Sequence, residues 1–181
     1  MSGDEDVQRK WHRKASEEKL RLAVFDAMRE EGSAAVSPSV IAQRAGLNKS
    51  LIYRYFGSVD VLVDEALRKH LIFPRPMDVV VQPAEEGDLT SAIALTWAEI
   101  QKVFRSHPEL LAVLAWSIGN SNQMAAKAFE GYRNFCERIA RELGPEPYLA
   151  PAILGLIVTE VGVQSNQRKK GHRPGTKNKK N

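Results

Sequence analysis

The feature that most restricts the fold is the segment from Ser37 to Phe56, SPSVIAQRAGLNKSLIYRYF. Its apolar residues recur at helical spacing on both sides of Gly46, which predicts two short helices joined by a sharp turn. Such a turn needs a positive φ, which glycine adopts without strain. Ser37 followed by Pro38 predicts the start of the first helix, and we expect the second to begin at Asn48. The apolar contacts expected to hold the pair are Val40, Ile41, Ala45, Leu47, Ile52 and Phe56.

Helical periodicity also runs through most of the remaining chain, so the predicted fold class is all-α. Ser16 is expected to cap a helix over residues 16–31, and Ser58 a helix that ends before Pro74. Further helices are expected over about 89–106, 109–118, 121–143 and 146–167. Residues 74–88 contain three prolines and a glycine, which predicts a boundary or loop. Residues 77–82 could form a short extended piece in it, but a lone strand has no partner here.

The net charge of +4 is unevenly distributed along the chain. Residues 7–57 hold ten basic and five acidic side chains, whereas residues 74–167 hold seven basic and eleven acidic ones. The last part, residues 168–181, holds seven basic side chains and no acidic one. The two basic ends favour a polyanionic partner and the acidic middle does not.

The polar residues of the two short helices are expected on their outer side. Asn48, Lys49 and Ser50 form the first turn of the second helix, the end that enters the major groove in a helix-turn-helix. Lys49 can donate to guanine, and Tyr53 and Arg54 one turn later suit the flanking phosphates. Each has a plainer alternative, in which Asn48 only caps the helix, Lys49 is merely solvated and Tyr53 packs inside. The other residues expected to contact DNA are Ser37 and Ser39, at the start of the preceding helix.

This segment resembles the DNA-binding signature of TetR/AcrR-type transcriptional regulators over about residues 16–72. The matching residues are Ile41, Ala42, Ala45, Gly46, Ile52, Tyr53, Tyr55, Phe56 and Leu62. The resemblance implies an all-helical homodimer that binds a palindromic double-stranded operator. It also implies a C-terminal domain that binds a small molecule, and that this ligand releases the DNA.

The sequence departs from the family pattern at one position of the fourth helix. Where the family usually has a lysine that contacts phosphate, this chain has Val59 followed by Asp60. One phosphate contact is therefore expected to be missing. The basic residues that could compensate lie in the N-terminal arm (Arg9, Lys10, Arg13 and Lys14) or in the C-terminal tail.

The regions expected along the chain follow from these signals. Residues 1–15 are a mobile basic arm, 16–57 the helix-turn-helix domain, 58–73 a connecting helix, 74–88 a loop, 89–167 the effector-binding and dimerisation domain, and 168–181 a basic disordered tail.

The C-terminal half contains no recognisable catalytic group or metal-ligand spacing, so an enzyme, a cofactor and a metal are not expected. Cys136 lies on an apolar stripe and is interpreted as a core residue. Aromatic and soft side chains from three successive helices are candidates to line an apolar ligand pocket, although ordinary core packing explains them as well. These candidates are Trp97, Phe104, Trp116, Met124, Phe129 and Tyr132.

A stripe of small residues on the last helix predicts close approach of another helix. Ala152, Gly155, Thr159 and Gly162 recur at helical spacing, and glycine costs about 1 kcal/mol in a helix interior relative to alanine. The predicted partner is a second copy, with residues 121–143 and 146–167 forming a four-helix bundle. The alternative is packing on the fifth predicted helix of the same chain, over about residues 89–106.

These signals favour a cytoplasmic, nucleoid-associated repressor released by a small, largely apolar ligand. The alternative is a sequence-specific regulator without such an effector, controlled by a protein partner. No transmembrane segment or secretory signal is expected, because the N-terminus is polar and the longest apolar stretch, residues 149–163, is interrupted by Glu160.

Overall fold

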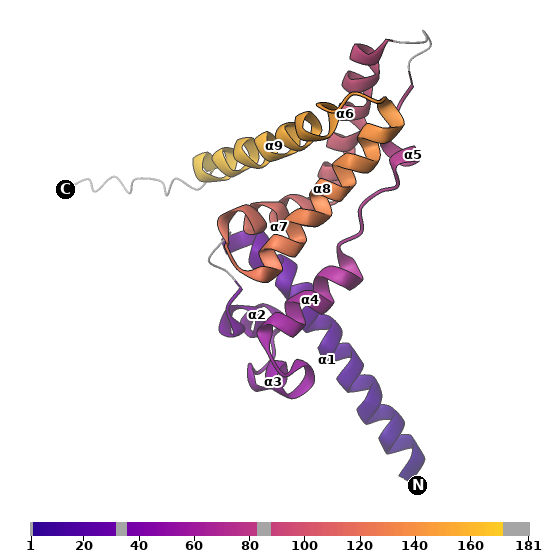
Figure 1. The fold of residues 1–181 in the computed structure, drawn as a ribbon. Helices are drawn as coiled ribbons and strands as arrows, with labels where there is room; N and C mark the ends of the chain where they lie inside the picture. Colours follow the sequence, from indigo (N-terminus) through magenta and orange to yellow (C-terminus); the bar gives the residue numbers. More distant parts are fainter. Residues whose placement is uncertain (1, 32–35, 83–87, 172–181) are drawn as a thin grey trace, which may run out of the picture.

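A computed structural model describes residues 2–31, 36–82 and 88–171. In these residues every regular element is a helix (Figure 1), which confirms the all-α prediction. None of the described helices is both long enough and apolar enough to span a membrane. The helices are α1 (Ser2–Glu31), α2 (Pro38–Ala45), α3 (Ser50–Phe56), α4 (Val59–His70), α5 (Pro76–Val79), α6 (Leu89–Ser106), α7 (Pro108–Gly119), α8 (Gln123–Leu143) and α9 (Leu149–Gly171).

Helices α1 to α4 form an N-terminal unit around one face of α1. This face packs against α2 and α4, and α3 packs against α4. Helical spacing of apolar residues along α1 produces the buried stripe. The side chains buried in this core include Leu20, Val24, Ala27, Met28, Ile41, Ile52, Phe56, Leu62 and Ala66.

Helix α7 lies at the centre of the C-terminal half and joins it to the N-terminal unit. It packs against α1, α6, α8 and α9. Most of its side chains are buried, from Leu110 to Ser117. Helix α9 then folds back on α8, with Leu149, Ile153 and Ile157 buried.

The segment between α4 and α5 is anchored on α8 by Phe73. Its ring stacks on Phe135 at 5.2 Å between centroids and meets Tyr132 edge-on at 4.8 Å. Offset and edge-to-face geometries of this kind are the favoured ones for aromatic pairs. The Tyr132 hydroxyl donates to the backbone carbonyl of Leu110, which ties α8 to α7.

Helix α1 is longer than the sequence prediction. It begins at Ser2, so the part of the 1–15 arm that is described is helical, and the helix expected from Ser16 starts earlier. The predicted cap at Ser16 is wrong, because its hydroxyl donates to the His12 carbonyl inside the helix. Ion pairs at helical spacing, Asp6–Arg9 at 3.9 Å and Arg13–Glu17 at 2.8 Å, support the added turns.

Two other boundaries differ from prediction. The extended piece expected over residues 77–82 is wrong in its first part, because Pro76–Val79 is a helical turn in which the Asp78 carboxylate accepts from the Arg75 N–H. Helix α9 continues to Gly171, so residues 168–171 of the expected tail are helical. The rest of that tail, residues 172–181, lies outside the described residues.

Candidate DNA-binding interface

The turn between α2 and α3 has the backbone that its glycine predicts. Gly46 has a φ of 65° and ψ of 33°, the left-handed conformation. Its N–H and that of Leu47 donate to the carbonyls of Gln43 and Ala42 at 3.1 and 2.9 Å, which ends α2 with satisfied carbonyls. The position therefore suits glycine, and a β-branched residue here would be strained.

Side chains cap the starts of the helices that form and flank this turn. The Ser37 hydroxyl accepts from the Val40 N–H at 3.3 Å, and the Ser58 hydroxyl accepts from the Val61 N–H at 3.2 Å, as predicted for both. Helix α3 begins at Ser50 rather than at Asn48. The Asn48 amide oxygen still accepts from the Ser50 N–H at 2.9 Å, so Asn48 caps the first turn from two residues away.

The inner face of α3 is fixed by apolar packing and by an arginine of α1. Ile52 and Phe56 are buried. The Arg21 guanidinium lies 5.1 Å from the centre of the Phe56 ring and also binds Glu65 of α4 at 2.8 Å. A cation–π contact contributes about 0.5–1 kcal/mol at an exposed site, and more when water is excluded. Together these contacts hold α3 between α1 and α4.

A second cation–π contact lies further out on α1. The Arg13 guanidinium is 5.3 Å from the centre of the Tyr55 ring, which is half-buried and packs against the core. Neither arginine contact is predicted above from the sequence. The pairing of Arg13 and Arg21 with Glu17 at helical spacing is a signal that could have indicated their orientation.

The outer face of α3 is exposed. Tyr53 is 51% exposed, so the alternative in which it packs inside is wrong. Helix α3 and the turn before it lie at the same end of the molecule as the N-terminus of α1 (Figure 1). Of the residues predicted to contact DNA, Ser37 is half-buried, and the exposed ones are Ser39, Asn48, Lys49, Ser50, Tyr53 and Arg54.

The start of α4 next to this surface carries no cation. Val59 is half-buried at the first helical position and Asp60 is exposed in the first turn. An acidic first turn suits the positive end of the helix dipole. The carboxylate does not suit a phosphate, so this corner of the interface differs from the pattern noted for the family.

The structure places the candidate pocket residues within or against the C-terminal core. Phe104, Trp116 and Tyr132 are no more than 2% exposed. Trp97, Met124 and Phe129 are half-buried and pack against the same core. Burial raises the pKa of the Tyr132 phenol well above its usual value, so this hydroxyl stays protonated and donates to Leu110. Cys136 is buried in the core, as expected.

The candidate dimer residues lie on the outer side of α9. Ala152, Gly155, Thr159 and Gly162 are not buried. A Cβ atom added to either glycine would meet nothing within 4 Å. The alternative in which this stripe packs on another helix of the same chain is therefore wrong for the described residues.

Comparison with known proteins identifies the N-terminal unit. Residues 24–66 match the family model described as bacterial regulatory proteins, tetR family. The match starts within α1, spans α2 and α3, and ends within α4, so it covers the turn at Gly46 and the exposed face of α3. Neither the search of curated proteins nor the search of solved structures found a match. The N-terminal part of the chain is therefore similar to the DNA-binding domain of bacterial regulatory proteins of the tetR family.

Proposed function

We propose that the protein is a repressor whose homodimer binds a palindromic operator and is released by a small, largely apolar ligand. The proposal that the protein binds DNA rests on α3, which has one buried and one exposed side. One side is locked by Ile52 and Phe56, and the other leaves Tyr53 and Arg54 exposed. A short helix fixed in this way can enter the major groove with a defined orientation.

Each exposed residue has a proposed role. Lys49 donates to guanine O6 or N7, and the amide nitrogen of Asn48 and the hydroxyl of Ser50 bind base edges or phosphate. Tyr53 and Arg54 bind phosphates and set the position of the helix without reading sequence. Ser37 and Ser39 lie at the start of α2, where the backbone N–H groups favour an anion.

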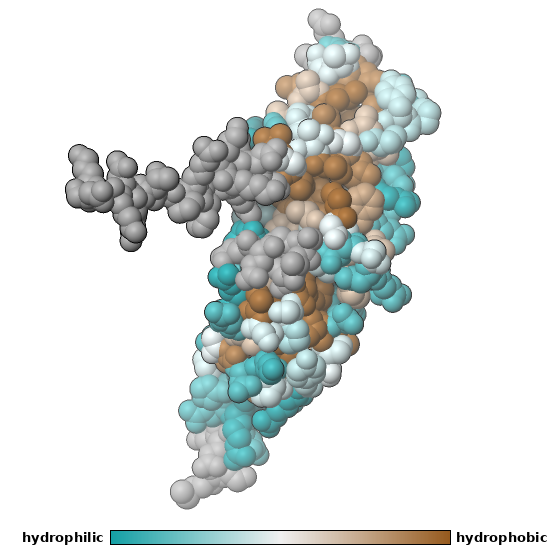
Figure 2. All heavy atoms as spheres, turned by 90° about the vertical axis from the view of Figure 1, so that its left-hand side faces the viewer, coloured by the Kyte–Doolittle hydropathy of each residue, from teal (hydrophilic) through white to brown (hydrophobic). Residues whose placement is uncertain are grey.

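The dimer is proposed from the outer side of α9. The small residues Ala152, Gly155, Thr159 and Gly162 leave room for a second helix backbone. Exposed apolar side chains lie on the same helix, including Leu156 and Val163. Figure 2 faces the side from which α9 projects, and apolar residues gather there in a band along the molecule. Contiguous apolar surface on a globular protein is typical of an interaction site. A two-fold dimer presents two copies of α3 to a palindrome.

The effector site is proposed within the core formed by α6, α7 and α8. A ligand that enters beside Tyr132 must move Phe73, since the two rings are in contact. Phe73 closely follows α4, and α4 packs against α1 and α3. Displacing Phe73 would therefore change the position of α3, and with it the spacing of the two recognition helices, about 34 Å for one turn of DNA.

A second candidate is a regulator without a small-molecule effector, controlled by a protein partner. The observation that favours it is the close packing of half of the candidate pocket. Phe104, Trp116 and Tyr132 are fully buried, and the Tyr132 hydroxyl is already bonded to Leu110.

Selection of bound fragments from the source genome tests the DNA-binding proposal. We expect one recurrent palindromic sequence that binds in preference to a scrambled duplex in fluorescence anisotropy. Equal affinity for both would contradict the proposal. A metabolite screen then separates the two candidates, because a ligand that binds one state must raise the melting temperature and shift operator affinity. Light scattering at micromolar concentration tests the dimer.

A further inference from the structure

The N-terminal turns of α1 extend beyond the packed body of the protein. Every described side chain from Asp6 to Lys14 is exposed, and the first buried one along the helix is Leu20. Val7 and Trp11 are 68% and 66% exposed. These turns bury no described side chain against the rest of the protein, so packing on the same chain does not explain why they are present. A helix of only a few turns is marginal in water without such packing.

The chemistry of this extension is that of a polyanion-binding element. Residues 9–14, RKWHRK, which we call the basic segment, hold four cationic side chains and no acidic one. Lys10 and Lys14 are exposed and form no ion pair within the described residues. Their spacing of four places them on one side of the helix.

The basic segment lies next to α3, the proposed recognition helix. Arg13 contacts the Tyr55 ring of α3 at 5.3 Å. Figure 1 shows α3 and the N-terminal end of α1 at the same end of the molecule, with α1 running past α3. A duplex that lies on the exposed face of α3 therefore passes beside the basic segment.

We propose that the basic segment is a second DNA-contacting element, which binds the phosphate backbone beside the groove read by α3. This inference rests on the proposed function. The charges are complementary, since DNA carries one negative charge per about 1.7 Å of its axis and the segment spans about 9 Å. The basic segment supplies cations to this interface, because the start of α4 carries Val59 and Asp60 and no cation.

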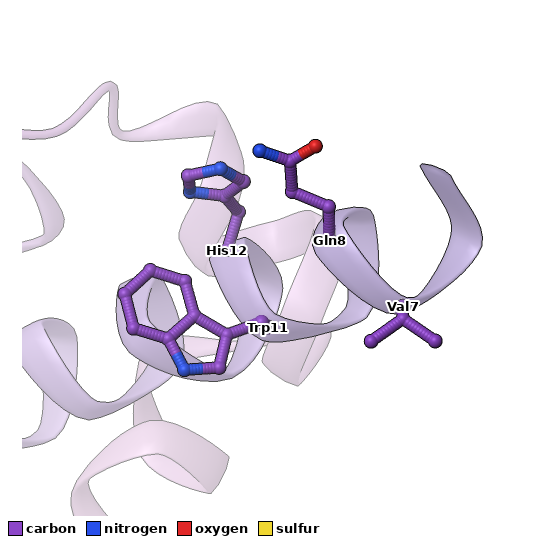
Figure 3. Close-up of a pocket in the computed structure, with 4 residues that line it drawn as sticks. All are labelled: Val7, Gln8, Trp11 and His12. Carbon is purple, nitrogen blue, oxygen red and sulfur yellow. The ribbon is translucent and has the colours of Figure 1, made fainter. Parts of the chain in front are cut away.

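Trp11 provides a local reporter of this contact. With Val7, Gln8 and His12 it lines a hollow of about 510 Å³ on the extension (Figure 3). Its ring meets that of His12 edge-on at 5.4 Å between centroids. The indole belongs to the same helical turns as Lys10 and Lys14, and we expect DNA bound to the basic segment to shield it from solvent.

The first test removes the two lysines and measures the salt dependence of binding. We compare the double variant Lys10→Gln, Lys14→Gln with Lys19→Gln, Arg105→Gln, which removes the same charge from exposed positions outside the basic segment. Anisotropy with a duplex recovered from the genomic selection is recorded between about 50 and 200 mM salt. The slope of log K against log salt should fall by about 0.9 for each phosphate that the variant no longer neutralises, and the control should keep the wild-type slope. Preference for the selected over the scrambled duplex should persist, because phosphate contacts carry no sequence information.

The second test follows acrylamide quenching of Trp11, taken as the difference between wild type and Trp11→Phe. The selected duplex should protect this component. Unchanged quenching at saturating DNA would overturn the inference. Protection that appears with rising protein concentration and no DNA would overturn it as well, and would assign this surface to a second copy instead.

The outcomes separate this inference from the proposed function. If the wild type prefers the selected duplex but the lysine variant keeps the wild-type slope, only the second contact is overturned. If the wild type binds selected and scrambled duplexes equally, sequence-specific recognition itself fails, and this inference fails with it.

Discussion

Gly131 of α8 lies directly under the ring of Phe73. A Cβ atom at Gly131 would come within 3.3 Å of the Phe73 Cε2 atom. The absent side chain lets the segment after α4 approach the α8 backbone closely. This contact joins the DNA-binding unit to the C-terminal helices, alongside the packing of α1 on α7.

A double-mutant cycle tests the contact between Gly131 and Phe73. Gly131→Leu should lower the free energy of unfolding by about 1–3 kcal/mol, because the larger side chain must displace the ring. In a Phe73→Ala background the same substitution should cost much less, so the two changes should couple by more than about 0.5 kcal/mol in urea unfolding. Strictly additive costs would show that the residues do not interact.

The thiol of Cys136 should be unreactive in the folded protein. Burial raises its pKa to about 12, and the thiolate is the reactive form. At about pH 8, near the ordinary pKa of a free thiol, a disulfide reagent should modify Cys136 only after unfolding in urea. Native protein that reacts as fast as unfolded protein would contradict the burial of this side chain.

Glu18 should contribute stability that depends on pH. The hydrogen bond from Lys69 lowers the pKa of this carboxyl below its usual value of 4.5, and the charges of His70 and Arg21 act in the same direction. A lowered pKa in the folded state gives stability that is complete above the unfolded pKa and is lost as pH falls through the folded one. Glu18→Gln should thus destabilise by at most about 1 kcal/mol near neutral pH, since the group is partly exposed.

The pH series provides the control for Glu18. Urea unfolding of wild type and Glu18→Gln should differ near neutral pH and converge below pH 4.5. A difference that stays constant down to the lowest pH would mean that the glutamate acts through packing and not through its charge.

Gly155 tests the proposed dimer without disturbing the monomer. Because a Cβ atom there meets nothing within 4 Å, Gly155→Leu should leave the fold intact, and it removes the helix cost of glycine, about 1 kcal/mol. It should weaken self-association strongly, seen as a shift toward monomer in light scattering. Leu95→Ala, at an exposed position of α6, is a surface control that should leave self-association unchanged. Dimerisation unaffected by Gly155→Leu would exclude the small-residue stripe from the interface.

Local features of the DNA-binding domain could be predicted from the sequence. The turn at Gly46 and the caps at Ser37 and Ser58 depend on residues within a few positions of one another. The exposed side of α3 follows from the spacing of Ile52 and Phe56, which fixes what remains outside. Signals of this short range do not need knowledge of the rest of the fold.

The features that the sequence did not predict depend on contacts between distant parts of the chain, or on local signals that favour different structures. Ser16 has the chemistry of a cap, but ion pairs at helical spacing carry α1 through it to Ser2. The placement of Phe73 on Gly131 joins distant parts of the chain, and neither residue carries a local pattern that indicates it. The candidate pocket and dimer residues stay predictions, since burial and exposure alone do not identify a ligand or a partner.

The most direct test of the account is DNA discrimination by Lys49→Ala and Tyr53→Ala, with Tyr148→Ala as an exposed tyrosine control. Affinities for the selected and scrambled duplexes are measured by anisotropy at one salt concentration. Lys49→Ala should reduce the preference for the selected duplex by about 1–3 kcal/mol, whereas Tyr53→Ala should weaken binding to both. The control should behave as wild type. Unchanged affinity and preference in both α3 variants would contradict the assignment of α3 as the recognition helix.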